Sequence, residues 1–216
     1  MPAPLFKPAV LKVLTTGAMK QVVLAVVPEF EKATGHKVSV MNDTAGALAK
    51  RIEAGEAFDL GIITPAAVDD LIAKGKFAAG SRVNLASVGL GVAAKAGAPL
   101  PDIGTVEAFK RALMNAKSIV YTDPAGGGSG GIYFAKLLER LGLAEQMKPK
   151  TILVRGALAA ERVAAGEAEL AITQMSEILP VPGVVVVGPL PKEIQNVTTY
   201  AGGLGAAAKN SEAAKA

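Results

Sequence analysis

The residues best placed to do chemistry form a glycine-rich run over residues 123–131, Asp-Pro-Ala-Gly-Gly-Gly-Ser-Gly-Gly. The run follows a short β-branched segment, 118–121, and precedes a helical pattern over 132–141. The backbone N–H groups of such a run and the positive end of the next helix attract an anion. The lysine and hydroxyl of a phosphate-binding P-loop are replaced by Ile132 and Tyr133, and the glycines match a dinucleotide motif only as any glycine run does. We interpret the run as an anion cradle, with a ligand-free surface loop as the alternative.

Polar or small residues also stand at four other points where a predicted strand passes into a helix. These corners are Thr15-Thr16-Gly17, Thr44-Ala45-Gly46, Arg155-Gly156 and Thr173-Gln174. In an open parallel sheet, ligands bind beyond the carboxyl ends of the strands, which is where all of these corners fall. For each threonine taken alone, a helix N-cap is favoured over a ligand contact. The set of corners together predicts a ligand site.

The corners belong to a regular alternation of short apolar runs and helical segments. The first half shows strands over 10–15, 37–41 and 60–64 and helices over 19–34, 46–54 and 65–74. The second half shows helices over 106–115, 132–141 and 157–165 and strands over 118–121, 151–154 and 170–173. Gly35, Gly55 and Gly75 follow the first three helices, where a left-handed residue ends a helix. This alternation predicts an α/β protein whose second half repeats the architecture of the first.

Two related segments predict how the halves are connected. Residues 89–95 read Gly-Leu-Gly-Val-Ala-Ala-Lys and residues 203–209 read Gly-Leu-Gly-Ala-Ala-Ala-Lys. We interpret them as a pair of crossover strands at a hinge, with chance matching in an Ala- and Gly-rich chain as the alternative. The layout they predict is a first lobe of residues 1–87 and 198–216 and a second lobe of residues 88–197.

The amino-acid composition excludes several classes of function. Hydrophobic residues make up 50% of the 216 residues but aromatic ones only 4%, so the core must be aliphatic, as in buried parallel sheets. The 23 basic and 19 acidic residues are scattered evenly, which argues against a nucleic-acid partner. The chain has no Cys and a single His, so it almost lacks the residues that zinc sites and Cys or Ser/His nucleophile pairs require. We therefore expect neither metal nor cofactor.

The sequence also bears on location and on weaker candidate residues. Residues 1–10 lack the apolar core of a signal peptide and no stretch of 18 apolar residues occurs, so we expect a protein that is not membrane-embedded, shown without any signal. His36 is expected to be an exposed turn residue without a role. Arg155 could bind a carboxylate ligand or form an ion pair with Glu161 or Asp123. We expect Asp69 and Asp70 to lie on a solvent-exposed face of the helix predicted over 65–74.

The pattern resembles the molybdate-binding-like family of extracellular solute-binding proteins, over nearly the whole chain. The segments that carry the resemblance are residues 28–35 (Pro-Glu-Phe-Glu-Lys-Ala-Thr-Gly), 48–56 (Leu-Ala-Lys-Arg-Ile-Glu-Ala-Gly-Glu), 59–60, 130–133 (Gly-Gly-Ile-Tyr), 154–158 (Val-Arg-Gly-Ala-Leu) and 165–169 (Ala-Gly-Glu-Ala-Glu). The resemblance implies a type II periplasmic-binding fold, with two mostly parallel sheets flanked by helices and joined by two crossover strands. It also implies a closing helix on the first lobe, and Ser211 and Glu212 look like a helix start.

Carried over by position, the family's binding sites fall on the corners already described. The implied ligand-binding residues are Thr16, Gly17, Ala18, Thr44, Ala45, Gly46, Ser129, Gly130, Gly131, Tyr133, Val154, Arg155 and Gln174. Two departures matter, because Ala18 stands where the family has a hydroxyl donor and Gln174 where it has a late Tyr. We therefore expect a carboxylate-bearing anion to be preferred over a tetrahedral metal oxyanion.

The resemblance implies a monomeric periplasmic protein that captures a small anion in an interlobe cleft and delivers it to the membrane component of an ABC importer. Residues 176–183 and 187–191 are similar to a subgroup that includes periplasmic aconitate isomerases. That opens an alternative, in which Tyr133, Asp123 or Glu177 would act as acid or base on an unsaturated tricarboxylate. A sensor module that presents its ligand to a membrane receptor would use the same cleft.

Overall fold

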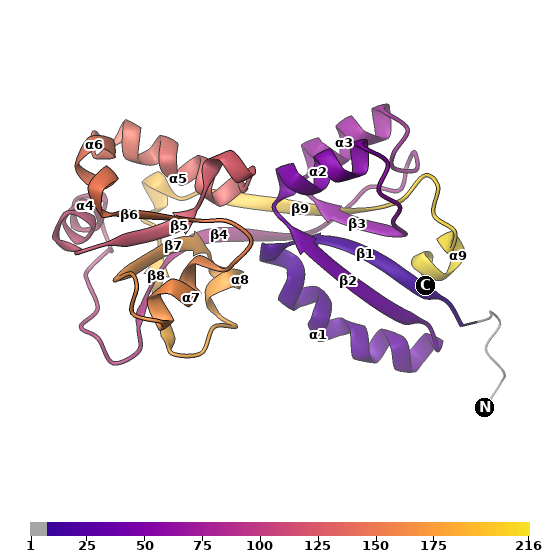
Figure 1. The fold of residues 1–216 in the computed structure, drawn as a ribbon, viewed down its shortest axis with the longest axis horizontal. Coiled ribbons are helices and arrows are strands. Elements are labelled where there is room, and N and C mark those ends of the chain that lie inside the picture. The colour runs from indigo at the N-terminus through magenta and orange to yellow at the C-terminus, as the bar shows by residue number, and fades with distance from the viewer. Residues whose placement is uncertain (1–7) are drawn as a thin grey trace. The chain divides into compact units, whose positions relative to one another are not determined.

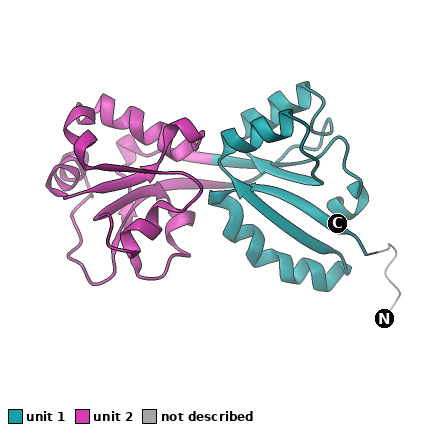
Figure 2. Cartoon of the chain, in the orientation of Figure 1, with its two compact units in different colours: residues 1–86, 199–216 teal, residues 87–198 magenta. Residues whose placement is uncertain are grey.

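The computed structural model describes residues 8–216, which form two compact units. Unit 1 comprises the described residues up to Ala86 together with Thr199–Ala216, and unit 2 comprises Ser87–Thr198 (Figure 2). Most of the N-terminal segment in which the sequence shows no signal-peptide pattern lies outside the described residues. Within residues 8–216, no helix combines the length and the apolar character needed to cross a membrane.

Unit 1 is built on the strands that the first half of the sequence predicts. Its strands are β1 (Val10–Thr16), β2 (Lys37–Asp43), β3 (Leu60–Ile63) and part of β9 (Val197–Leu204), and its helices are α1 (Gly17–Thr34), α2 (Ala45–Glu53), α3 (Pro65–Ala73) and α9 (Ser211–Lys215). β1 pairs in parallel with β2 and β3, and β9 runs antiparallel to β3. Helices α2 and α3 lie on one face of this sheet and α1 on the other (Figure 1). The α2 and α3 face holds a core cluster that includes Leu14, Leu48 and Ile63.

Unit 2 repeats the α/β theme. Its strands are β4 (Val83–Lys95, of which Ser87–Lys95 belongs to this unit), β5 (Ile119–Thr122), β6 (Thr151–Val154), β7 (Leu170–Gln174) and β8 (Val184–Pro189). Its helices are α4 (Val106–Asn115), α5 (Ser129–Arg140), α6 (Ala144–Met147), α7 (Ala159–Ala164) and α8 (Met175–Ile178), with 3-10 turns η1 (Pro124–Gly126), η2 (Lys148–Lys150) and η3 (Lys192–Ile194). β5 is parallel to β6 and β7, whereas β4 is antiparallel to β7 and β8. The chain is thus mixed α/β, as the sequence predicts.

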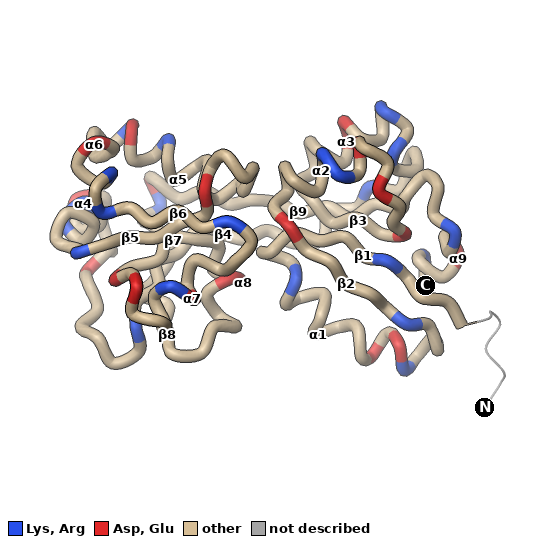
Figure 3. The backbone as a smooth tube through the Cα atoms, viewed as in Figure 1, with Lys and Arg blue, Asp and Glu red and all other residues tan. Residues whose placement is uncertain are grey.

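The core of unit 2 divides over the two faces of its sheet. One cluster includes Phe109, Phe134 and Leu137 from α4 and α5, and the other includes Val163 and Ile178 from α7 and α8. Burying one such aliphatic or aromatic side chain contributes roughly 1.5–3 kcal/mol, so these faces fix the helices on the sheet. Because the helices are fixed, the residues at their first turns are held at the ends of the strands. Basic and acidic residues are interspersed along both units, without a long run of one sign (Figure 3).

Three expectations need correction. Residues 89–95 lie in β4 as predicted, but only Gly203 and Leu204 of the second segment lie in β9, because the strand ends at Leu204. His36 is not an exposed turn residue: it is 2% exposed, and its Nδ1 accepts a hydrogen bond from the Ala9 N–H at 3.2 Å. Gly35, with φ of 76°, turns the chain back so that His36 is buried beside β1. The helix predicted over 132–141 starts earlier, at Ser129.

Candidate functional site

In unit 1, the three parallel strands end at one edge, and each is followed at once by a helix whose N-cap is a threonine. Thr44 caps α2 through its side chain, whose Oγ1 accepts from the Ala47 N–H at 3.2 Å. Thr16 caps α1 only by position, because its side chain makes no capping hydrogen bond. The hydroxyl of Thr16 is therefore not used by the helix that it precedes.

The hydroxyls of Thr15 and Thr16 are both buried, and neither has a hydrogen-bond partner. Gly17 and the buried Ala18 form the first turn of α1, which carries no acidic side chain to offset the positive helix end. This corner therefore offers unused hydroxyls beside an electropositive helix terminus. In α2, Ala45 is buried and Gly46 is partly exposed, so neither adds a polar side chain.

In unit 2, the glycine-rich run folds into a turn and the start of a helix. After η1, Gly127 adopts a φ of 76°, Gly128 is the N-cap, and Ser129, Gly130 and Gly131 form the first turn of α5. A Cβ on Gly131 would lie 2.0 Å from the Thr122 carbonyl oxygen at the end of β5. Only glycine therefore lets the N-terminus of α5, with its free N–H groups, approach the carboxyl end of the sheet.

Arg155 pairs with Asp123 and not with Glu161. Its Nε donates to Asp123 Oδ2 at 2.6 Å, while 67% of the Arg155 side chain remains exposed. The Ala125 N–H and the Arg155 guanidinium hold the pKa of Asp123 below its usual value. The carbonyl of Val154, a buried residue at the end of β6, accepts from the Asp123 N–H at 2.9 Å. The charge of Arg155 is thus already partly balanced by Asp123.

Tyr133 is engaged inside unit 2. Its hydroxyl donates to the carbonyl oxygen of Ile194 at 2.9 Å and accepts from Arg140 Nη2 at 3.1 Å. The Arg140 guanidinium also lies over the Tyr133 ring, 5.7 Å from its centre. These contacts give Tyr133 a structural role.

The carboxyl end of β7 holds two further polar atoms without partners. Gln174 is 3% exposed, and its Nε2 donates to Thr198 Oγ1 at 3.0 Å, whereas its Oε1 has no hydrogen-bond partner. Two residues later, the Oγ of Ser176 is also buried and unpartnered. Sequence reasoning selected Gln174 but missed Ser176 and left Thr15 out of the binding set. Their position within two residues of a strand end was the available signal.

Glu177 is the one carboxyl at these corners whose pKa is raised, and burial is the main cause. The Thr173 hydroxyl donates to Glu177 Oε2, and the Gln174 backbone N–H also donates to the carboxylate, which partly offsets the effect of burial. Because Gln174 is the N-cap of α8 and Glu177 is three residues further on, the second bond is one half of a capping box. Glu177 therefore stabilises the corner as well as carrying a proton more readily than an exposed glutamate.

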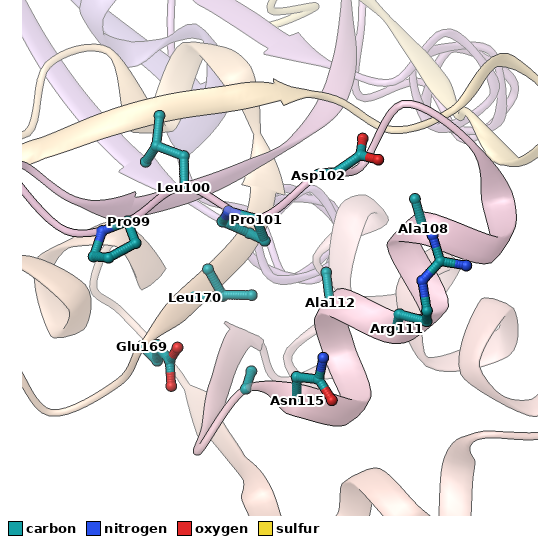
Figure 4. A pocket seen from close by; sticks show the side chains of 11 residues that line it. Pro99, Leu100, Pro101, Asp102, Ala108, Arg111, Ala112, Asn115, Glu169 and Leu170 are labelled. Carbon is teal, nitrogen blue, oxygen red and sulfur yellow. The ribbon is translucent and has the colours of Figure 1, made fainter.

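A separate open pocket of about 290 Å³ lies at the opposite, amino end of β7. It is lined by the loop 99–102, by Arg111 and Asn115 of α4, and by Glu169 and Leu170 (Figure 4). It shares no residue with the corners described above.

The sequence matches a family of solute-binding proteins. A family model described as "Bacterial extracellular solute-binding protein" matches residues 11–216, so the chain belongs to this family. A relative named aconitate isomerase, from Pseudomonas sp, is 35% identical over 212 residues, covering 95% of this chain and 79% of the relative.

Solved structures of periplasmic binding proteins share the fold. The periplasmic molybdate-binding protein of Azotobacter vinelandii superimposes with a TM-score of 0.79 at 19% identity, covering 95% of this chain and 89% of that one. The tungstate-binding protein of Desulfovibrio alaskensis superimposes with a TM-score of 0.61 at 18% identity, covering 97% and 88%. The predicted periplasmic-binding fold and the resemblance to the molybdate-binding-like family, including its aconitate isomerase subgroup, are therefore confirmed.

Proposed function

We propose that this protein captures a small, carboxylate-bearing anion in the periplasm and delivers it to the membrane component of an ABC importer. One observation carries the proposal: in the described part of the chain, the buried side-chain oxygens that lack a partner are Thr15 Oγ1, Thr16 Oγ1, Gln174 Oε1 and Ser176 Oγ. Each costs roughly 1–3 kcal/mol while it stays unpaired. Thr15 and Thr16 lie at a strand-to-helix corner of unit 1, and Gln174 and Ser176 lie at one of unit 2. A ligand that pairs with the unpartnered atoms of a corner recovers this cost there.

The helix ends supply the attraction for negative charge. The N-termini of α1 and α5 bear no acidic side chain in their first turns, and α5 approaches its sheet through Gly131. Neutral donors of this kind bind anions without needing a free cation, which agrees with the pairing of Arg155 to Asp123.

The choice of a carboxylate over a metal oxyanion rests on two residues. Ala18 offers no hydroxyl at the first turn of α1, and Gln174 has one donor committed to Thr198. A carboxylate and a tetrahedral oxyanion both only accept hydrogen bonds, but a carboxylate-bearing molecule can also carry a donor for the unpaired Gln174 Oε1, which a metal oxyanion does not.

Thermal unfolding with a ligand panel tests the proposal. Molybdate, tungstate, sulfate, citrate and the two aconitates are each added to the purified protein. A ligand at a hundred times its Kd stabilises by about 2.7 kcal/mol and should raise Tm by roughly 5–10 °C. We expect such shifts from one or more carboxylates and not from molybdate. Variants of Thr16 and of Gln174 then report which corner contacts the ligand, and a shift that neither variant reduces would contradict the assignment of these corners.

Isomerisation of aconitate is a second candidate function, favoured by the 35% identical relative and by Glu177. Of the three acid or base candidates, the Tyr133 hydroxyl is hydrogen-bonded to the backbone and the pKa of Asp123 is lowered, whereas burial raises the pKa of Glu177. A proton-transferring carboxyl benefits from such a shift. Proton NMR of cis- and trans-aconitate in D₂O would show interconversion that Glu177→Gln abolishes, since Gln retains the capping geometry. Absence of turnover by the wild-type protein would exclude this candidate.

A further inference from the structure

The two ends of the Gln174 amide have different surroundings. Nε2 donates to Thr198 Oγ1 at 3.0 Å, and the same oxygen also accepts from Asn196 Nδ2 at 3.3 Å. With Nε2 anchored to Thr198, Oε1 is the end of the amide that has no partner. The side chain is 3% exposed, and the oxygen itself is buried. The corner therefore keeps a buried acceptor in need of a donor.

The Gln174 side chain, which carries this acceptor, lies close to the first turn of α5. A Cβ built on Gly130, in the first turn of α5, would lie 3.1 Å from Leu90 Cδ2 and 3.6 Å from Gln174 Nε2. Leu90 and Gln174 are register partners on β4 and β7, so the first turn of α5 packs over this pair. Ser176 Oγ, which can donate or accept, is unpartnered two residues further along the chain.

We propose that this corner selects carboxylates that carry a hydrogen-bond donor, a hydroxyl or an ammonium group, beside the carboxylate. The inference rests on the proposed function and deepens it by naming the ligand class. The carboxylate binds the N–H groups at the start of α5, and the neighbouring donor binds Gln174 Oε1. A ligand with acceptors only, such as succinate or molybdate, leaves Oε1 buried and unpaired. This difference is worth roughly five- to hundredfold in affinity.

Isothermal titration with matched ligand pairs tests the inference. Malate and aspartate are each compared with succinate, and citrate is compared with tricarballylate, so that each pair differs in one donor group. We expect the donor-bearing member of one or more pairs to bind about tenfold tighter or more. Malate against aspartate then decides whether the donor is a hydroxyl or an ammonium group.

Variants of Gln174 and its neighbours test whether the Gln174 amide causes the difference in affinity within a ligand pair. Gln174→Met removes the acceptor at nearly constant volume and should reduce the ratio within a pair to about one. Gln146→Met, at an exposed position of α6, is the matched control and should leave the ratio unchanged. Thr198→Val removes the oxygen that anchors Nε2, so the amide can turn and the ratio should fall even if Gln174→Met folds poorly.

Failure of this inference can be distinguished from failure of the proposed function. Equal affinities within every pair, or a ratio that survives Gln174→Met, overturns the inference while carboxylate binding itself leaves the proposed function standing. If no carboxylate binds and molybdate does, the proposed function and the inference both fall.

Discussion

Replacing Thr16 by Val should stabilise the ligand-free protein and weaken the ligand complex. The Thr16 hydroxyl is buried, lacks a partner and makes no capping bond to α1. In the ligand-free protein, no hydrogen bond offsets the free-energy cost of removing this hydroxyl from water. Valine fills nearly the same volume without the hydroxyl. Removing an unsatisfied buried hydroxyl should raise the free energy of unfolding by about 1–2 kcal/mol, which for a chain of this length raises Tm by roughly 2–8 °C. Loss of the donor should weaken ligand binding by about tenfold.

Thr44→Val is the matched control, because Thr44 occupies the corresponding position before α2 but its Oγ1 accepts from the Ala47 N–H. Losing that cap should lower the free energy of unfolding by about 0.5–2 kcal/mol, the opposite sign. Differential scanning calorimetry without ligand measures both changes, and titration measures the affinity. A lower Tm for Thr16→Val, or an unchanged affinity, would refute the assignment of this hydroxyl to the ligand.

Two further predictions concern stability. Arg51 and Lys12 lower the pKa of Glu56 to about 2, so the stabilisation is present above the ordinary carboxyl pKa of 4.5 and is lost as pH falls from about 5 to 2. Glu56→Gln should therefore lower the free energy of unfolding by about 1–2 kcal/mol at pH 7, after allowance for partly exposed partners, and by much less near pH 2. A pH-independent difference in urea unfolding would contradict this. Gly131→Ala places a Cβ 2.0 Å from the Thr122 carbonyl oxygen and should lower stability by about 2–4 kcal/mol. In Gly126→Ala the new Cβ would lie 3.9 Å from its nearest neighbour, Arg155 Cγ, so this control should change stability little. Equal melting temperatures for the two variants would count against the close approach of α5.

Much of the fold could be predicted because each element has a local signal. Short β-branched runs followed by helical periodicity locate β1 to β3 and α1 to α3, and Gly35 marks the end of α1 by its left-handed φ. The predicted start of α5 was three residues late, because glycine has low helix propensity and the run was taken as a loop. Packing against Thr122 and Leu90, which local sequence does not show, places these glycines in the helix.

The candidate site could be located from sequence, but the state of its side chains could not. Which corners carry polar residues follows from the strand ends, and Thr16, Ser129 and Gln174 lie where strands pass into helices. Whether a hydroxyl or amide is already paired depends on contacts made over long sequence separations, such as Gln174 with Thr198 and Arg155 with Asp123. His36 illustrates the same limit, since its burial results from packing beside Ala9 and Phe30.

The most direct test of the account is isothermal titration of the wild-type protein with molybdate and with a set of di- and tricarboxylates under one buffer condition. The account predicts that one or more carboxylates bind and that molybdate binds more weakly or not at all, because a carboxylate-bearing molecule can carry a donor for Gln174 Oε1 and molybdate does not. Tight binding of molybdate, with no heat from any carboxylate, would contradict it.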